Sequence, residues 1–385
     1  MDNTSRLTLQ GIEQNNVNIT KLWLGGNGRD YCGRSPNSHW KFASGDISQL
    51  GAAISKNTRL ETLVVGDHTL VENEKGFYDG LECNSSIKRL SIYCNSNSSN
   101  ILGMCYHKND IVGGIGQEML NIYQGNQNLI GLSLENANLQ NGGDLILATT
   151  LRSCTNLKRL SLCRNNMLDG QLLPIVEAIR SLHSLEVLGL VDNKIGDVGC
   201  TAISTLFEDS SCIINLLNIT FNNIKDEGAI SLVNSLANNT KLKVLYFHNN
   251  KIASYGSIKE SLRIHLSRLL CNTASINDIY LSNHTLQTLE LTGHRFNSLL
   301  KMNAETNKSH VAIKKILQYH PNIDVSKLLE LDSEEVEEEE NIKILPHVIA
   351  WLGNAAEVVD TEKSNLLSVL YLFAKARPLM LVPAL

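Results

Sequence analysis

The 385-residue sequence contains little proline and few aromatic residues: 6 prolines, and 5% Phe, Trp and Tyr together. A proline-rich scaffold is therefore excluded. Long apolar runs are also missing, because the longest late run, at residues 366–374, is too short to span a bilayer. The first ten residues, MDNTSRLTLQ, lack the charged start and apolar stretch of a signal peptide. We therefore expect a soluble protein in the cytoplasm, or alternatively in the nucleus, with no membrane contact.

Charge and cysteine spacing narrow the class of protein further. The net charge is −5, and residues 330–340 hold eight acids and no base, so removing those acids changes the net charge to +3. Neither value is the strong basic footprint of a nucleic-acid binder, and we expect no nucleic-acid partner. The 9 cysteines are scattered and never occur as C-x-x-C, which indicates reduced thiols rather than disulfides or a zinc site.

Catalytic signatures are missing as well. Glycine clusters at residues 25–28 and 113–116 fit neither the phosphate-loop pattern nor the dinucleotide-binding pattern. The sequence contains no H-E-x-x-H and no G-x-S-x-G, and Cys163 has no evident His partner. The acidic run lacks the spacing of a calcium loop and is typical of a solvated loop. We predict that the protein is not an enzyme and uses no cofactor and no metal.

An internal repeat dominates the sequence. The frame L-x-x-L-x-L-x-x-N occurs at residues 157–165, 185–193, 214–222 and 242–250, with looser copies starting at 19, 60, 87, 129 and 276. Successive starts from 129 to 242 are separated by 28, 28, 29 and 28 residues. A fixed period of this length is the signature of a solenoid, in which stacked units share one core.

Each unit is predicted to be a short strand followed by a helix. Frame positions one, four and six point inward, and the apolar residues behind the frame recur at helical spacing. The residue at position nine lies where the chain turns, and its amide can bond backbone groups of neighbouring turns. These positions form the predicted asparagine ladder: Asn27, Asn95, Asn165, Asn193, Asn222 and Asn250.

A repeat of 28 to 29 residues with a full helix resembles the ribonuclease-inhibitor subtype of leucine-rich repeat. The resemblance covers roughly residues 19–293 and implies an α/β solenoid: a horseshoe with a parallel inner sheet and outer helices. The expected organisation is an N-terminal cap at 1–18 and a solenoid at 19–298 with insertions near 25–42 and 95–110. A helical C-terminal region follows at 299–385, with an acidic loop at 330–340, and we expect it to cap the solenoid.

Four further blocks, at residues 45–58, 270–285, 311–321 and 345–351, resemble a group of uncharacterised ribonuclease-inhibitor-like proteins from unicellular algae. This likeness extends over nearly the whole chain. It implies the same fold and no particular activity.

The frame also predicts a binding surface. Positions three, five and seven should face the open inner curve, with basic and aromatic residues in the first half and apolar residues in the second. A contiguous apolar patch and a set of Tyr, Trp and Arg residues favour a protein partner, although the C-terminal helices or a loop would alternatively cover the patch. The candidate residues are Lys21, Trp23, Arg89, Tyr93, Arg159, Val187, Val191, Leu216, Phe221, Val244, Tyr246 and Tyr280.

The predicted function is therefore that of a monomeric, non-catalytic module that binds a protein partner on its concave face. The alternative is a regulator of a small GTPase, since Ran GTPase-activating proteins share this repeat subtype and often carry an acidic tail. Here helical sequence follows the acidic run, and stimulated GTP hydrolysis would separate the two hypotheses. Ribonuclease inhibition is disfavoured because Lys21, Arg89 and Arg159 have the wrong charge for a basic nuclease.

Overall fold

A computed structural model of the chain describes residues 3–15, 19–24, 44–66, 75–93, 128–135, 139, 142–254, 257–258, 260–290, 296–306 and 308–319. The predicted insertions near 25–42 and 95–110, the ladder positions Asn27 and Asn95, and the acidic loop at 330–340 lie outside these residues. The chain divides into two compact units. The first comprises Met1–Leu266 and Thr288–His294, and the second comprises Ser267–Gln287 and Arg295–Leu385.

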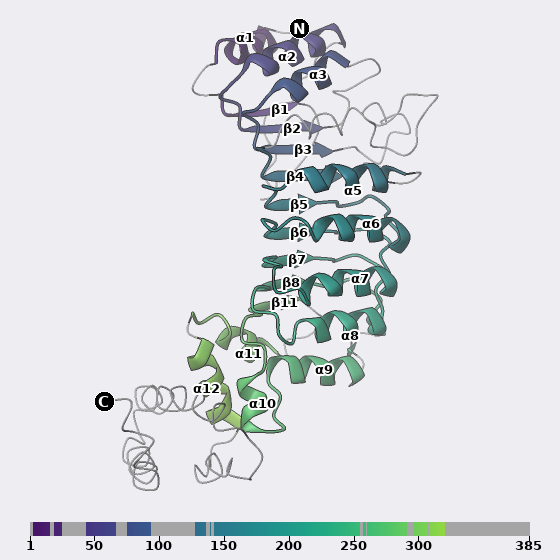
Figure 1. The fold of residues 1–385 in the computed structure, drawn as a ribbon, viewed down its shortest axis with the longest axis vertical. Coiled ribbons are helices and arrows are strands. Elements are labelled where there is room, and N and C mark those ends of the chain that lie inside the picture. The colour runs from purple at the N-terminus through teal and green to yellow at the C-terminus, as the bar shows by residue number, and fades with distance from the viewer. Residues whose placement is uncertain are drawn as a thin grey trace, which may run out of the picture. The chain divides into compact units, whose positions relative to one another are not determined.

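Strands and helices alternate along the first unit, which confirms the predicted strand–helix repeat (Figure 1). The strands are β1 (Lys21–Leu24), β2 (Thr62–Gly66), β3 (Arg89–Tyr93), β4 (Gly131–Glu135), β5 (Arg159–Ser161), β6 (Val187–Gly189), β7 (Leu216–Asn218), β8 (Val244–Tyr246) and β11 (Thr288–Glu290). The helices are α1 (Asn3–Glu13), α2 (Ser44–Lys56), α3 (Lys75–Cys83), α5 (Gly143–Ser153), α6 (Asp169–Ile179), α7 (Asp197–Phe207), α8 (Asp226–Ser235) and α9 (Glu260–Leu270), which continues into the second unit. A short hairpin, β9 (Ala253–Ser254) and β10 (Ser257–Ile258), precedes α9.

The nine strands form one parallel sheet in the order β1-β2-β3-β4-β5-β6-β7-β8-β11. The second residue of every strand is a leucine, and the register pairs these leucines from strand to strand across the sheet. They are at most 9% exposed, as at Leu289, and most are fully buried, as at Leu188. This continuous leucine row is the core that a single repeat cannot form alone, because its apolar edge is covered only by its neighbours.

Helices α5 to α8 form a second layer on one side of the sheet (Figure 1). Glycines set how closely this layer packs. A Cβ added at Gly199 would lie 2.6 Å from Asp169 Oδ1, and one at Gly228 would lie 2.8 Å from Asp197 Oδ1. Those aspartates bind the neighbouring turn: Asp197 Oδ1 accepts hydrogen bonds from the backbone N–H groups of Lys225, at 2.8 Å, and Gly228, at 3.1 Å. Each aspartate thus joins its helix start to the next repeat, and glycine leaves the space for it.

The second unit contains α10 (Ile276–Tyr280), α11 (Asn297–Met302) and α12 (Lys308–Tyr319). The prediction of a repeat strand starting at Ile276 is wrong, since this segment is helical. Ser275 begins the helix: its Oγ accepts a hydrogen bond from the Asp278 backbone N–H at 3.0 Å and donates one to Asp278 Oδ2 at 2.6 Å. Ser275 is therefore the N-cap of this helix, and an N-cap serine favours a helix over a strand. The ninth strand of the sheet is β11, at the frame that starts ten residues later.

A fully buried lysine anchors α12 within the second unit. Lys315 Nζ donates to the Leu270 carbonyl oxygen at 2.6 Å and lies 3.1 Å from His284 Nδ1. His284 Nε2 lies 3.0 Å from the Tyr280 carbonyl oxygen, so the neutral ring donates from Nε2 and accepts at Nδ1. Burial, followed by the positive charge of Lys315, lowers the pKa of His284 to about 4. Burial also lowers the pKa of Lys315 to about 8.

Candidate functional site

The sheet has one face covered by the helix layer and an opposite face, which we call the open face. Side chains alternate along a strand, so the residues on either side of each buried leucine lie on the open face. In β6, Leu188 is buried while Val187 and Gly189 are half-buried, and β7 and β8 repeat this pattern. Alternation therefore places the predicted position-three and position-five residues on this face of the sheet.

The first residues of the strands form a continuous row across the open face, which we call the strand-start row. Register pairs its neighbours directly, so consecutive members are about 4.8 Å apart, the usual spacing between strands. In order, the row reads Lys21, Thr62, Arg89, Gly131, Arg159, Val187, Leu216, Val244 and Thr288. Its character changes from cationic to apolar between β5 and β6.

The cationic half contains Lys21, Arg89 and Arg159, and all three side chains are exposed. Within the described part of the chain, no ion pair neutralises any of them. Gly131 lies between the two arginines, and a Cβ added there would be 3.5 Å from Arg89 Cγ. The Arg89 side chain therefore lies over the glycine, on the side of the sheet where Arg159 follows.

The apolar half contains Val187, Leu216 and Val244 on three adjacent strands, all half-buried. Tyr246 follows on β8 and is also half-buried, as is Val191, which lies just after β6. At β11, the last strand of the sheet, the open-face residues are polar. His248 Nδ1 lies 3.1 Å from Glu290 Oε2 there. The structure thus gathers five of the predicted apolar and aromatic residues on one stretch of the open face.

Phe221 lies at the rim of this apolar half with 51% of its surface exposed. Its backbone is left-handed, with φ of 57°, a conformation that bulky residues rarely adopt. The equivalent residues of three other repeats, Arg164, Asp192 and Asn249, share it, with φ between 55° and 56°. Backbone bonds between turns hold the shape: Phe221 N–H donates to the His248 carbonyl oxygen at 3.2 Å, and Asp192 N–H to that of Thr220 at 3.0 Å. The rings of Phe221 and His248 meet edge to face, with centroids 6.0 Å apart.

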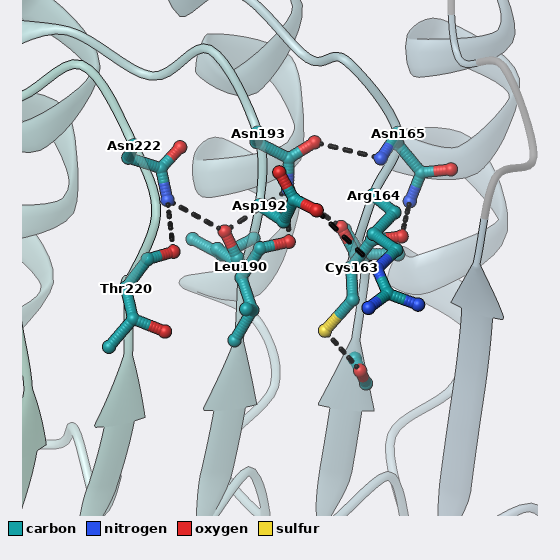
Figure 2. Close-up of polar contacts among 11 residues, drawn as sticks. Cys163, Arg164, Asn165, Leu190, Asp192, Asn193, Thr220 and Asn222 are labelled. Carbon is teal, nitrogen blue, oxygen red and sulfur yellow. Dashed lines mark hydrogen bonds and ion pairs between the residues drawn. The ribbon is translucent and has the colours of Figure 1, made fainter. Parts of the chain in front are cut away.

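An asparagine ladder supports the turns from behind. Asn193 Oδ1 accepts hydrogen bonds from the backbone N–H groups of Asn165 and Met167, each at 3.0 Å. Its Nδ2 donates to the carbonyl oxygens of Leu162, at 2.9 Å, and Leu190, at 3.1 Å. Figure 2 shows the Asn193 amide joined to the Asn165 backbone N–H and the Asn222 amide joined to the Leu190 carbonyl oxygen, which links successive turns. Asn165 Nδ2 likewise donates to the Leu134 carbonyl oxygen of the preceding repeat. Asn250 continues the series by bonding the carbonyl oxygens of Ile219 and Phe247.

A second asparagine series lies at the opposite end of the strands, and our sequence analysis missed it. Asn57, Asn84, Asn239 and Asn283 are buried where helices end and strands begin. Each accepts backbone N–H bonds through Oδ1, as Asn84 does from Ser86, at 2.9 Å, and Ile87, at 3.0 Å. The sequence signal for this series is an Asn that stands three residues before the first leucine-type position of the repeat frame.

A polar groove of about 750 Å³ runs along the edge where the strands begin. It is lined from Thr20, before β1, to Ser184, before β6, and Ile130 is the one apolar side chain among the described residues that line it. Lys88 Nζ lies 2.6 Å from Glu61 Oε1, and Lys158 Nζ lies 3.1 Å from Glu186 Oε1. The Lys88 hydrogen bond and then its charge, with smaller effects of Arg89 and Lys21, lower the pKa of Glu61.

Other predicted site residues have different outcomes. Trp23 and Tyr93 belong to β1 and β3, but their side chains lie outside the described part of the structure. Tyr280 was expected on the open face; this is wrong, because it ends helix α10 in the second unit. Its spacing from Ile276 fitted a strand frame as well as a helical turn.

The described residues also bear on metal binding, on two buried thiols and on membrane spans. They contain no group of three or more His, Cys, Asp or Glu side chains placed to hold a metal ion. Burial raises the pKa of Cys154 to about 11 and that of Cys200 above the ordinary range, which keeps both thiols protonated. Within the same residues, none of the helices has the length and apolarity needed to span a membrane.

Comparison with known proteins found a matching family model and similar solved structures. The leucine-rich repeat family model matches residues 181–204 and 211–233. Among solved structures, the chain is similar to the tropomodulin C-terminal domain of Caenorhabditis elegans, with 10% identity, a TM-score of 0.31, and coverage of 46% of this chain and 93% of that one. It is also similar to an internalin of Listeria monocytogenes, with 16% identity, a TM-score of 0.33, and coverage of 75% and 87%. No curated protein matches the sequence.

The matched repeats and the parallel sheet with its alternating helices define the class: the fold is an α/β leucine-rich-repeat solenoid. Leucine-rich-repeat proteins are generally protein-interaction modules, which directs the search for a function to the exposed faces.

Proposed function

We propose that the protein is a non-catalytic interaction module that binds a partner protein on the open face of its sheet. It would use the ribonuclease-inhibitor-like repeat and act as a monomer in the cytoplasm. The proposal rests on the apolar half of the open face, where Val187, Leu216 and Val244 lie side by side beside Tyr246. A solvent-exposed sheet face normally carries polar residues, so a contiguous apolar stretch favours a partner surface.

Phe221 is the residue that most strongly supports a partner-binding surface. Its left-handed backbone would suit Asn or Gly, and a bulky residue there costs about 1–2 kcal/mol. It is also half exposed, so its ring recovers only part of the free energy that full burial would supply. Strained residues that persist on a surface cluster at binding sites, and exposed aromatic residues are frequent energetic anchors of interfaces. Phe221 is therefore the residue we expect to enter a pocket of the partner.

The test compares two double variants of the tagged full-length protein in quantitative affinity purification from its native cells. Phe221→Asn with Tyr246→Ala changes the open face. Leu145→Ala with Val198→Ala removes matched apolar surface from the helix layer, where these residues are 59% and 62% exposed. We expect specific partners to fall at least tenfold with the first variant and to remain within twofold with the second.

Folding is checked separately. Asn at position 221 relieves the backbone strain while the edge contact with His248 is lost, so we expect Phe221→Asn alone to change the free energy of unfolding by less than about 1 kcal/mol. Recovery of the same proteins in equal amounts by wild type and both double variants would contradict the proposal. Equal loss with both would assign the binding to the helix layer or to apolar surface in general.

A further inference from the structure

Positive charge is concentrated at one place on an acidic protein. The chain carries −5 overall, yet the strand-start row and the residues just before it, from β1 to β5, carry five cations and one carboxylate. The cations are Lys21, Lys88, Arg89, Lys158 and Arg159, and the carboxylate is Glu61. A cluster with an excess of positive charge attracts ligands of opposite charge and selects against others.

Ion pairs within the protein involve two of these five cations and leave three without an acidic partner among the described residues. Lys88 is held by Glu61 and Lys158 by Glu186, at 2.6 Å and 3.1 Å. Lys21, Arg89 and Arg159 have no such partner among the described residues, and all three lie in the same register row. Because guanidinium groups bind carboxylates through two parallel hydrogen bonds, the two arginines are suited to acidic side chains.

From this arrangement we infer that the cationic half of the strand-start row binds an acidic segment of the partner protein. The inference rests on the proposed function and specifies its ligand: carboxylate-bearing residues over β1 to β5, followed by apolar residues over β6 to β8. The row from Lys21 to Arg159 crosses four strand spacings, about 19 Å, which an extended segment of about six residues matches. Gly131 and the polar groove beside the row leave room for it.

Charge complementarity and continuity favour an acidic peptide over a phosphate polymer. The strand-start row becomes apolar at Val187, and a nucleic-acid backbone has no group to cover Val187, Leu216 and Val244. A peptide supplies both parts in one chain, with carboxylates first and aliphatic side chains next.

The test uses the full-length protein and three fluorescein-labelled peptides in fluorescence anisotropy at 50 mM salt. Their sequences are six Glu followed by Leu-Leu-Tyr, six Gln followed by the same tripeptide, and six Lys followed by the same tripeptide. We expect the Glu peptide to bind at least tenfold more tightly than the Gln peptide, and the difference to shrink at 300 mM salt because charges are screened. The Lys peptide should not bind.

Two double variants locate the effect. Arg89→Gln with Arg159→Gln should weaken the Glu peptide at least tenfold, and Arg152→Gln with Lys241→Gln, which removes the same charge from exposed sites elsewhere, should change it less than twofold. Equal affinities for the Glu and Gln peptides, or equal losses with both variants, would overturn the inference. Equally tight binding of a single-stranded RNA hexamer that responds to the same two arginines would overturn it in favour of a phosphate polymer.

The alternative ligand for the strand-start row is the acidic run of the chain itself. If the Glu peptide binds only after the eight acids of residues 330–340 are changed to Gln, an internal segment occupies the row and the inference of a partner segment is overturned. The proposed function remains separable throughout, because capture of partners that depends on Phe221 and Tyr246 does not require Arg89 or Arg159.

Discussion

At the scale of the residue, Asn193 satisfies four buried backbone groups with one amide. Asn193→Ala would leave two N–H donors and two carbonyl oxygens without these partners. We expect the free energy of unfolding to fall by about 2–4 kcal/mol, because a buried polar group left unpaired costs about 1–3 kcal/mol and turns can partly relax. Urea denaturation followed by circular dichroism measures the change.

Asn238→Ala serves as the control for this prediction, because Asn238 is exposed and bears no ladder bond. A loss below about 0.5 kcal/mol is expected there. An equally small loss at Asn193 would show that solvent or relaxation replaces the ladder bonds.

The two asparagine series show what single residues reveal from sequence. Asn165, Asn193, Asn222 and Asn250 were predictable because they recur at position nine of an unbroken frame. The second series was missed because other repeats replace it: Cys154, Leu182 and Ser211 stand three residues before their frames. A role that only some repeats fill with Asn leaves a weaker period, although the chemistry at each site is the same.

At the scale of the element, the packing of neighbouring helices depends on glycine at positions where a side chain would clash. Gly199→Ala places a Cβ 2.6 Å from Asp169 Oδ1 and 2.8 Å from Ile195 Cγ2, so the helix must shift away from its neighbour. We expect a loss of about 1–3 kcal/mol in the free energy of unfolding, typical of overpacking. Thermal and urea denaturation of the purified variant provide the measurement.

Gly170→Ala is the matched comparison. A Cβ at Gly170 meets nothing within 4 Å, and alanine has the higher helix propensity. A gain of about 0.5–1 kcal/mol is therefore expected at this position in α6. If the two variants behaved alike, close approach would not be what determines glycine in these helices.

The repeat frame predicts strands correctly in the central repeats and fails at residues 276–281. Frames starting at 157, 185, 214 and 242 gave strands because each alternates around a central leucine and is followed by a helix. Residues 276–281 carry Ile276, Ile279 and Leu281, which fit a strand frame and a helical turn equally well. Ser275 decides between them as the N-cap of the helix, with Asp278 bonded to its hydroxyl, and this serine was visible in the sequence.

At the scale of the whole molecule, the two compact units should respond differently to acid. The pKa of His284 is lowered to about 4 from an ordinary value near 6.5, so the unfolded chain binds a proton before the folded unit does. Stability from the neutral ring is complete above pH 6.5 and is lost as the pH falls toward 4. Each pKa unit corresponds to about 1.4 kcal/mol, so the loss is at most about 3.5 kcal/mol.

Hydrogen exchange at pH 7 and pH 5, corrected for intrinsic rates, tests this behaviour. Peptides from α12 should lose protection at pH 5 while those from α7 keep it. His284→Asn should flatten the difference. Lys315 and Lys308, both on α12, are the positive charges that act on the ring, and the Glu305–Lys314 ion pair lies in the same unit. A slope unchanged in the variant would assign the pH dependence to carboxylates instead.

At position 221 and its three equivalents, the backbone conformation is the same while the side chain that would meet a ligand differs. Arg, Asp, Phe and Asn occupy the same left-handed turn at 164, 192, 221 and 249, so the peptide path there is dictated by stacking and tolerates chemically unrelated side chains. Exchange of these four residues among the repeats is then a combinatorial way to change ligand preference without changing the path of the backbone. Natural drift and laboratory selection can exploit the same freedom, which makes these four turns the place where paralogous binders would diverge first.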